Sequence, residues 1–218
     1  MAKSKATETE ASPAKKEVTI SPPNMQTAEF RITGTAPYMQ ARFSQKSMET
    51  MLAKHVQGSR GKKGTKKEPR DLDADYHGAM HKSTDGWLGI PSGAFRSALI
   101  SACRLVGFKM TIGKLAIFAE HDGLDAVDGI PLIKIEGEPE PTRMAVRNES
   151  GVCDIRIRPM WREWSAMVRI RFDADQMSLE DVTNLLARVG MQVGIGEGRP
   201  DAPNSCGIGY GLFRIDAH

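Results

Sequence analysis

The residues best suited to binding a ligand form a glycine-rich segment near the C-terminus. It has two parts, Gly194-Ile-Gly-Glu-Gly-Arg-Pro200 and Cys206-Gly-Ile-Gly-Tyr-Gly-Leu-Phe213. Glycine lets a backbone approach another backbone closely, and exposed N–H groups can then face phosphates. The segment follows a predicted helix and precedes a predicted strand, the reverse of a dinucleotide-binding fingerprint, and no P-loop sequence is present. Two interpretations remain: a flexible connection, or a phosphate-binding backbone to which Arg199 adds charge.

A run of arginines between residues 143 and 171 is the second candidate. It has seven arginines and no lysine, and its members are Arg143, Arg147, Arg156, Arg158, Arg162, Arg169 and Arg171. The planar guanidinium suits bidentate contact with phosphate and stacking on bases. Trp161 and Trp164 lie within this run. They either stack on bases or guanidinium groups, or belong to the core beside a solvated strand face.

A basic stretch of low complexity covers residues 58–70. Its six basic residues stand against one acid, Glu68, and are Arg60, Lys62, Lys63, Lys66, Lys67 and Arg70. Such a segment cannot bury enough apolar surface to offset its ordering entropy. The sequence therefore predicts a flexible basic loop that attracts polyanions through counterion release.

Candidates for catalysis are few. Asp71, Asp73 and Asp75 alternate ahead of His77 and His81, a group that could hold a divalent cation. The pattern lacks the glycine and terminal glutamate of a calcium loop, so a hydrated acidic turn is the favoured interpretation. The histidines are interpreted as surface or structural residues, and no serine or cysteine nucleophile motif is present. We expect no metal and no cofactor.

The elements that position these segments follow from hydrophobic periodicity. Strands are predicted at residues 28–33, 130–136, 165–173 and 210–215, and helices at residues 92–106 and 178–190. Ser92 is the expected N-cap of the first helix, and Ser178 opens the second in capping-box style. A short helix is expected within residues 47–56, and the run 114–120 is ambiguous. The order predicts an α+β protein with a ferredoxin-like (RRM-like) βαββαβ core and a large insert after the first strand.

The two helices of such a core cover one face of the sheet and leave the other for solvent or binding. Four arginines occupy polar positions of three strands, which predicts a cationic sheet face: Arg31, Arg169, Arg171 and Arg214. The sheet lacks the aromatic residues of an RRM platform, so base stacking on it is not expected.

Composition limits the domain count and the class of protein. The chain has 218 residues, which is enough for one domain with a hydrophobic core. Its apolar share of 40% is below the usual value, which indicates that part of the chain is not packed, and its net charge is +3. We expect a disordered tail at residues 1–25 and one domain at 26–218 with an insert at 38–86. Three separated cysteines support neither a zinc site nor a disulfide framework. Without a membrane-spanning run or signal peptide, a cytoplasmic protein is expected.

Two segments together resemble the RAMP superfamily, whose members bind guide RNA in CRISPR effector complexes. The glycine-rich segment is similar to its C-terminal signature, and Gly89-Ile-Pro-Ser-Gly-Ala-Phe-Arg-Ser-Ala-Leu99 resembles the stretch that opens its first helix. The layout is most similar to the backbone subunits that line up along the guide, with residues 38–86 as their thumb-like extension. The chain departs from that pattern at Ile100, where a basic residue is usual, and in its short C-terminus.

The resemblance implies which residues lie at the nucleic acid. Near the helix start these are Ser92, Phe95 and Arg96, and in the glycine-rich segment Gly194, Gly196, Gly198, Arg199, Gly209 and Gly211. Some backbone subunits cleave RNA with an aspartate of the insert, and the weak candidates here are Asp73, Asp75 and Asp85.

We therefore expect a protein that binds single-stranded RNA or DNA as repeated protomers, a homo-oligomer that can extend into a helical filament. Other effector-complex subunits are further candidate partners, and no membrane is involved. The charged contacts are expected from Arg60, Lys62, Lys63, Lys66, Lys67, Arg147, Arg156, Arg158, Arg162, Arg169 and Arg171. The alternatives are a metal-dependent ribonuclease using an insert aspartate, a stand-alone phage protein for single-stranded DNA binding or recombination, and an architectural protein that binds another protein.

Overall fold

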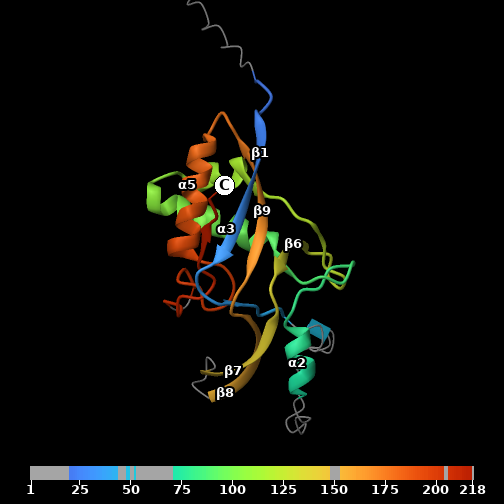
Figure 1. Cartoon of the computed structure of the whole chain (residues 1–218). Coiled ribbons are helices and arrows are strands. Elements are labelled where there is room, and N and C mark those ends of the chain that lie inside the picture. The colour runs from blue at the N-terminus through green and yellow to red at the C-terminus, as the bar shows by residue number, and fades with distance from the viewer. Residues whose placement is uncertain are drawn as a thin grey trace, which may run out of the picture.

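The computed structural model describes residues 20–43, 48–49, 52, 71–147, 153–203 and 206–217. Over these residues the chain is an α+β fold with four α-helices and two antiparallel sheets (Figure 1). The basic loop at 58–70, most of the tail at 1–25 and most of the helix predicted within 47–56 lie outside the described residues. None of the helices in the described part of the chain is long and apolar enough to cross a membrane.

The main sheet has seven strands, five of them in the order β10-β1-β9-β6-β3, with β4 beside β9 and β5 beside β6. Their bounds are Met25–Gly34 (β1), Gly89–Pro91 (β3), Ile117–Ala119 (β4), Gly123–Leu124 (β5), Pro131–Glu136 (β6), Ser165–Asp173 (β9) and Phe213–Ile215 (β10). Strand β9 has the bounds expected from its period of two. It buries Val168, Ile170 and Phe172 and turns Met167 to the opposite face.

Helices α3 (Ser92–Cys103) and α5 (Leu179–Arg188) pack together on one side of β1 and β9 (Figure 1). The apolar spacing of α3 explains this packing, because Phe95 and Leu99 are fully buried. The helix continues as a 3₁₀ turn to Val106, and Gly107 follows with a φ of 69°. The expectation for Ser92 is wrong: it is the first helical residue, and the preceding cap position is Pro91, which offers no side-chain hydrogen bond.

Helix α5 begins with the predicted capping box. The Ser178 hydroxyl accepts from the Asp181 N–H at 3.1 Å, and the Asp181 carboxylate accepts from the Ser178 N–H at 2.9 Å. Val182, Leu185 and Leu186 of this helix are buried, whereas Leu179 is 55% exposed. Gly190 does not end the helix, because a π turn carries the chain from Val189 to Val193 before Gly194 turns it.

Trp161 and Trp164 belong to the core. They are 0% and 3% exposed, and the Tyr38 ring lies against both, with centroids 5.4 and 5.6 Å away. The Trp164 indole N–H donates to the Ala36 carbonyl at 2.9 Å. The expectation that these rings stack on bases is wrong, and the alternative of core tryptophans is confirmed.

The second sheet is a long hairpin that the sequence did not predict. Strands β7 (Pro139–Arg147) and β8 (Cys153–Trp161) pair along their whole length, and β2 (Tyr38–Met39) adds to β8. Helix α2 (Leu72–Gly78) is tied to it by the Tyr76 hydroxyl, which donates to the Pro139 carbonyl at 2.9 Å. The hairpin and α2 lie at the end of the molecule away from α5 (Figure 1). The ambiguous run 114–120 is the end of α4 (Met110–Ala116) followed by β4.

Candidate functional site

A groove of about 590 Å³ separates α3 from the glycine-rich segment. Helix α3 contributes only small side chains to it: Gly93, Ala94, Ser97, Ala98 and Ser101. The facing wall comes from the C-terminal part of the chain and is formed by Val193, Ile195, Gly196, Glu197, Arg199 and Asp201. Tyr38, Gln40, Ala41, His81 and Pro91 complete the lining. The small side chains of α3, with Gly196 on the facing wall, leave room for an extended chain.

The N-terminus of α3 opens into this groove without a cap. No side chain bonds to its first turn, and that turn holds no acidic residue. The N–H groups of Gly93 and Ala94 have no hydrogen-bond partner among the described residues, and both residues line the groove. Unsatisfied N–H groups and the positive end of the helix dipole favour an anion at such a position.

The glycines that form the facing wall or pack behind it are required by close backbone contacts; Gly196 lines the groove, and Gly211 lies against Ile195. Gly196 has a φ of +77°, and a Cβ there would lie 2.5 Å from the Met39 carbonyl oxygen. Gly211 has a φ of +68°, and its Cβ would lie 1.8 Å from the Ile195 carbonyl oxygen. Side chains are excluded from both positions. A Cβ on Gly194 or Gly207 would also meet a backbone oxygen, at 2.9 Å from Tyr210 and 2.0 Å from Arg199. At Gly198 it would meet only side-chain atoms, at 3.0 Å or more, and at Gly209 it would have no atom within 4 Å.

The backbone N–H groups of two of these glycines are already hydrogen-bonded within the protein. The Gly194 N–H donates to the Val189 carbonyl at 2.8 Å, and the Gly211 N–H donates to the Pro37 carbonyl at 2.8 Å. These two groups therefore face protein, and what the glycines supply to the groove is mainly its shape. Arg199 lies in the groove, with its guanidinium donating to the Gly196 carbonyl at 3.0 Å.

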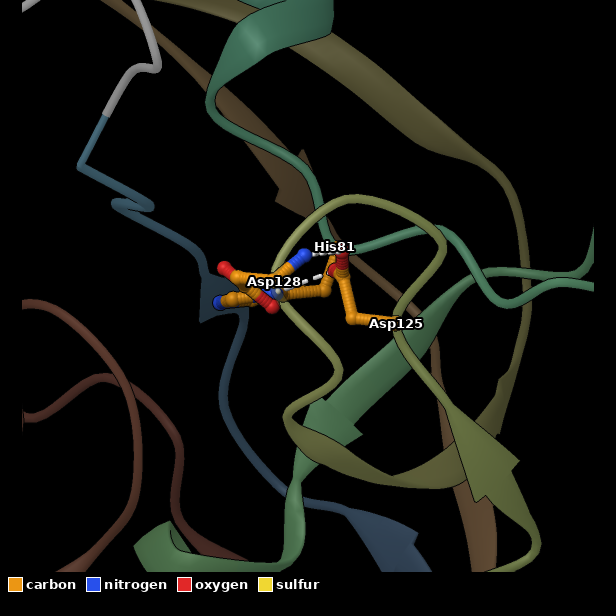
Figure 2. A group of neighbouring side chains, drawn as sticks. All are labelled: His81, Asp125 and Asp128. Carbon is orange, nitrogen blue, oxygen red and sulfur yellow. Dashed lines mark hydrogen bonds and ion pairs between the residues drawn. The ribbon is translucent and has the colours of Figure 1, made fainter. Parts of the chain in front are cut away.

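His81 lines the groove as a nearly buried imidazole, 6% exposed. Its Nδ1 lies 2.8 Å from Oδ2 of Asp125, which is 2% exposed and belongs to the loop between β5 and β6 (Figure 2). The His81 backbone is fixed as well, because its N–H donates to the Gln40 side chain at 2.9 Å. Sequence reasoning missed this dyad: Asp125 is distant in the chain, and no local spacing marks the pair.

Asp125 is held as a carboxylate. Its Oδ1 accepts from the Val127 N–H at 2.8 Å and from the Arg42 guanidinium at 3.1 Å. Burial on its own would raise the pKa of the Asp125 carboxyl. The hydrogen bonds from Val127, His81 and Asp128, with the Arg42 charge, outweigh burial and hold that pKa below its usual value.

His81, Asp125 and Asp128 bring possible metal-ligand atoms within 4.8 Å of one another (Figure 2). The Arg42 guanidinium binds both carboxylates, at 3.1 Å from Asp125 and 2.9 Å from Asp128. The arginine already occupies an oxygen of each carboxylate and supplies one positive charge, so we assign no metal ion to this group.

The acidic segment ahead of His81 does not assemble into the group that its spacing suggested. Asp71 caps α2 by accepting from the Asp73 and Ala74 N–H groups, and Asp73 is an exposed partner of His77 at 3.8 Å. His81 faces Asp125 instead. The three aspartates considered for catalysis, Asp73, Asp75 and Asp85, do not line the groove.

None of the three helix-opening residues named by the resemblance lines the groove. Ser92 is 7% exposed, and Phe95 is fully buried with its ring 6.1 Å from that of Phe213. The Arg96 guanidinium donates to the Lys114 carbonyl at 2.6 Å and to the Ile117 carbonyl at 3.1 Å. It therefore holds the end of α4, and Arg96 is not part of the groove lining.

The arginine run is largely engaged in ion pairs. Arg158 pairs with Glu197 at 2.9 Å and Arg162 with Glu140 at 2.9 Å. On the sheet face Arg169 pairs with Asp122 at 2.6 Å and Arg171 with Glu120 at 2.6 Å. Arg156 is half-buried. The side chain of Arg147 and the whole of Arg60, Lys62, Lys63, Lys66 and Lys67 lie outside what the structure describes.

A larger hollow of about 900 Å³ lies between α5 and residues 106–108. Its wall mixes apolar and polar side chains, and its charged members are engaged locally, Asp181 with Ser178 and Arg188 with Gln192. It holds no buried titratable group, so the groove beside α3 is the stronger candidate.

Comparison with known proteins adds no assignment. No family model matches the chain, and no curated protein matches it.

Proposed function

We propose that this protein binds single-stranded nucleic acid in the groove between α3 and the glycine-rich segment. It does so as a RAMP-like protein that resembles the RNA-binding backbone subunits of CRISPR effector complexes, with RNA and DNA as the two candidate ligands. The phosphodiester backbone lies against the N-terminus of α3, and the glycine wall gives the groove its width.

One observation carries the proposal. The two segments that resemble the superfamily are far apart in the sequence, and parts of both line one groove: Gly93 and Ala94 at the start of α3, and residues 195–197 and Arg199 of the glycine-rich segment on the opposite wall. Neither segment was selected by its position in space, so their meeting at a hollow with unsatisfied N–H groups supports a shared role. The small side chains of α3 leave that hollow open.

The strand order supports the ferredoxin-like interpretation of the core. The four strands that alternate with α3 and α5 are β1, β6, β9 and β10, and they lie side by side as β10-β1-β9-β6. The first and third strands are thus central, as in a split βαβ arrangement. Strands β3, β4 and β5, together with the hairpin, are then additions to this core.

The hairpin supports assembly of repeated protomers along the strand. It extends with α2 away from α5, and Arg143 is exposed on it (Figure 1). An arm of this kind can reach a neighbouring protomer or the next stretch of nucleic acid. Cleavage by an insert aspartate has less support, since Asp73, Asp75 and Asp85 lie off the groove.

The direct test measures fluorescence anisotropy of labelled oligo(U), oligo(dT) and duplex DNA at low and moderate salt. We expect single strands to bind better than duplex, with affinity falling steeply as salt rises. Ser97→Glu with Ser101→Glu places two negative charges on the α3 wall and should weaken binding by about tenfold or more. The matched control is Thr111→Glu with Asn184→Glu, the same charge change at exposed helix positions outside the groove.

The same experiment also measures strand binding by a variant of the sheet face. Arg169→Gln with Arg171→Gln removes two arginines that already pair with carboxylates, so binding should change by less than about threefold. Equal losses in the groove and control variants would contradict the groove. A loss confined to the sheet variant would move the interface to that face, and no binding of any strand would refute the function.

A further inference from the structure

The His81 imidazole has one nitrogen left over. Nδ1 is engaged by Asp125 at 2.8 Å, whereas Nε2 has no hydrogen-bond partner among the described residues. Nε2 is not fully enclosed by protein. In the described part of the chain, the side-chain nitrogen and oxygen atoms that are both fully buried and unpaired are Arg42 Nε and Trp161 Nε1. The His81 side chain is 8% exposed and the residue lines the groove, so the groove is the open space beside the ring.

The His81 ring lies among three charged side chains. Asp125 and Asp128 carry two negative charges and Arg42 one positive charge, so an imidazolium at His81 balances the group. The Asp125 carboxylate also fixes the ring orientation by accepting from Nδ1. Tyr38, whose hydroxyl pKa is raised by burial, stays neutral beside them.

The rest of the groove leaves room for an anion. Its two carboxylates are already paired, Glu197 with Arg158 at 2.9 Å and Asp201 with Arg104 at 2.7 Å. Arg199 adds a positive charge, and the α3 wall contributes no charged side chain. The uncapped Gly93 and Ala94 N–H groups open into the same space. Two independent features, an uncapped helix N-terminus and a nearly buried imidazole with an unpaired Nε2, therefore favour the same kind of ligand.

We infer that His81 is the phosphate-binding residue of the groove and that nucleic-acid binding is linked to uptake of a proton at its Nε2. The Nε2–H of the imidazolium donates to a non-bridging oxygen of a phosphodiester, whose other oxygen faces the N-terminus of α3. This inference rests on the proposed function and adds a regulation to it. An anion bound to the imidazolium stabilises the protonated form, so affinity rises as the pH falls through the range where histidine titrates.

The test follows the affinity for labelled oligo(U) and oligo(dT) from about pH 5.5 to about pH 8 at constant ionic strength. The bases of these probes do not titrate in that range. Wild-type affinity should fall by about tenfold as the pH rises. In His81→Gln the slope should vanish, and its affinity should match that of the wild type at the high-pH end. His77→Gln is the matched control, because His77 is exposed on α2 outside the groove, and it should keep the slope.

A second measurement needs no variant of His81. In the NMR titration of the wild-type imidazole Cε1–H signals, the midpoint of His81 should rise when oligo(U) is bound, while that of His77 stays unchanged. Strand binding with a flat pH profile and an unmoved His81 midpoint overturns the phosphate role and leaves the function standing. A slope that persists in folded His81→Gln also overturns it. No strand binding at any pH refutes the function and this inference together.

Discussion

The exposed face of the main sheet and the groove beside α3 use their polar groups in opposite ways. On the sheet face each of three arginines has a carboxylate partner: Arg31 with Glu136, Arg169 with Asp122 and Arg171 with Glu120. In the groove the Gly93 and Ala94 N–H groups and Nε2 of His81 are unpaired within the described structure. The difference shows that a count of charges does not predict a binding surface, because a paired arginine has less to offer a phosphate.

The largest expected effect comes from the glycine wall that shapes the groove. In Gly211→Ala the new Cβ would lie 1.8 Å from the Ile195 carbonyl oxygen at a φ of +68°. We expect a loss of more than about 3 kcal/mol in the free energy of unfolding, or failure to fold. Gly209→Ala is the matched control, since its φ is +83° but no atom lies within 4 Å of the Cβ.

Urea unfolding followed by circular dichroism measures both variants. Gly209→Ala should cost about 1–2 kcal/mol, the ordinary penalty for alanine in the left-handed region. Similar losses in the two variants would mean that backbone conformation, not the close approach to Ile195, decides the need for glycine. The wall would then be more adaptable than the contacts indicate.

The second-largest expected effect is the loss of stability when a carboxylate is removed beside the groove, compared with the loss on the sheet face. Asp125→Ala removes the partner of two buried cations, His81 when protonated and Arg42, and should destabilise the fold by about 3 kcal/mol. Asp122→Ala removes the partner of half-buried Arg169 and should cost less than about 1 kcal/mol. Thermal and urea unfolding at neutral pH give both values. If Asp122 proved the more costly, the groove would not be the more firmly built of the two regions.

Residues with a regular local pattern could be predicted from the sequence. The alternation in residues 165–173 gave the bounds and faces of β9, and Ser178 with Asp181 marked the start of α5. The hairpin β7–β8 could not be found in this way. The hairpin extends from the core, and its strands contain Pro139, Pro141 and Pro159. Buried and exposed residues do not alternate regularly along these strands. Without one buried face a strand has no period of two to detect.

The candidate site was predicted only in part. The glycine-rich segment and the start of α3 were identified by their residues. Of the residues named there, only Gly196 and Arg199 line the groove, whereas Ser92, Phe95 and Arg96 do not. Arg96 was misleading, because a guanidinium that holds the carbonyls of α4 has the same sequence signature as one that binds phosphate. The pair of His81 and Asp125 was beyond reach, since two loops bring it together through tertiary packing alone.

The smallest expected effect lies on the sheet face and depends on pH. The hydrogen bonds from Arg31 and then Ser165 hold the pKa of the Glu136 carboxyl below its ordinary value, with burial opposing them weakly. A carboxyl whose pKa is lower in the folded than in the unfolded chain adds stability above the unfolded value of about 4.3. That contribution disappears as the pH falls through the folded value, when both states become protonated.

Glu136→Gln should therefore lower the free energy of unfolding by less than about 1 kcal/mol at neutral pH, because both partners are partly exposed. The difference from wild type should vanish in acid, below the folded pKa. Urea unfolding of both proteins across this range measures it. A difference that persisted in acid would assign the effect to packing, and one as large as that of Asp125→Ala would erase the contrast between the two surfaces. A small difference that acid removes would identify the arginines of this face as neutralised by their partners, leaving the groove to bind the anion.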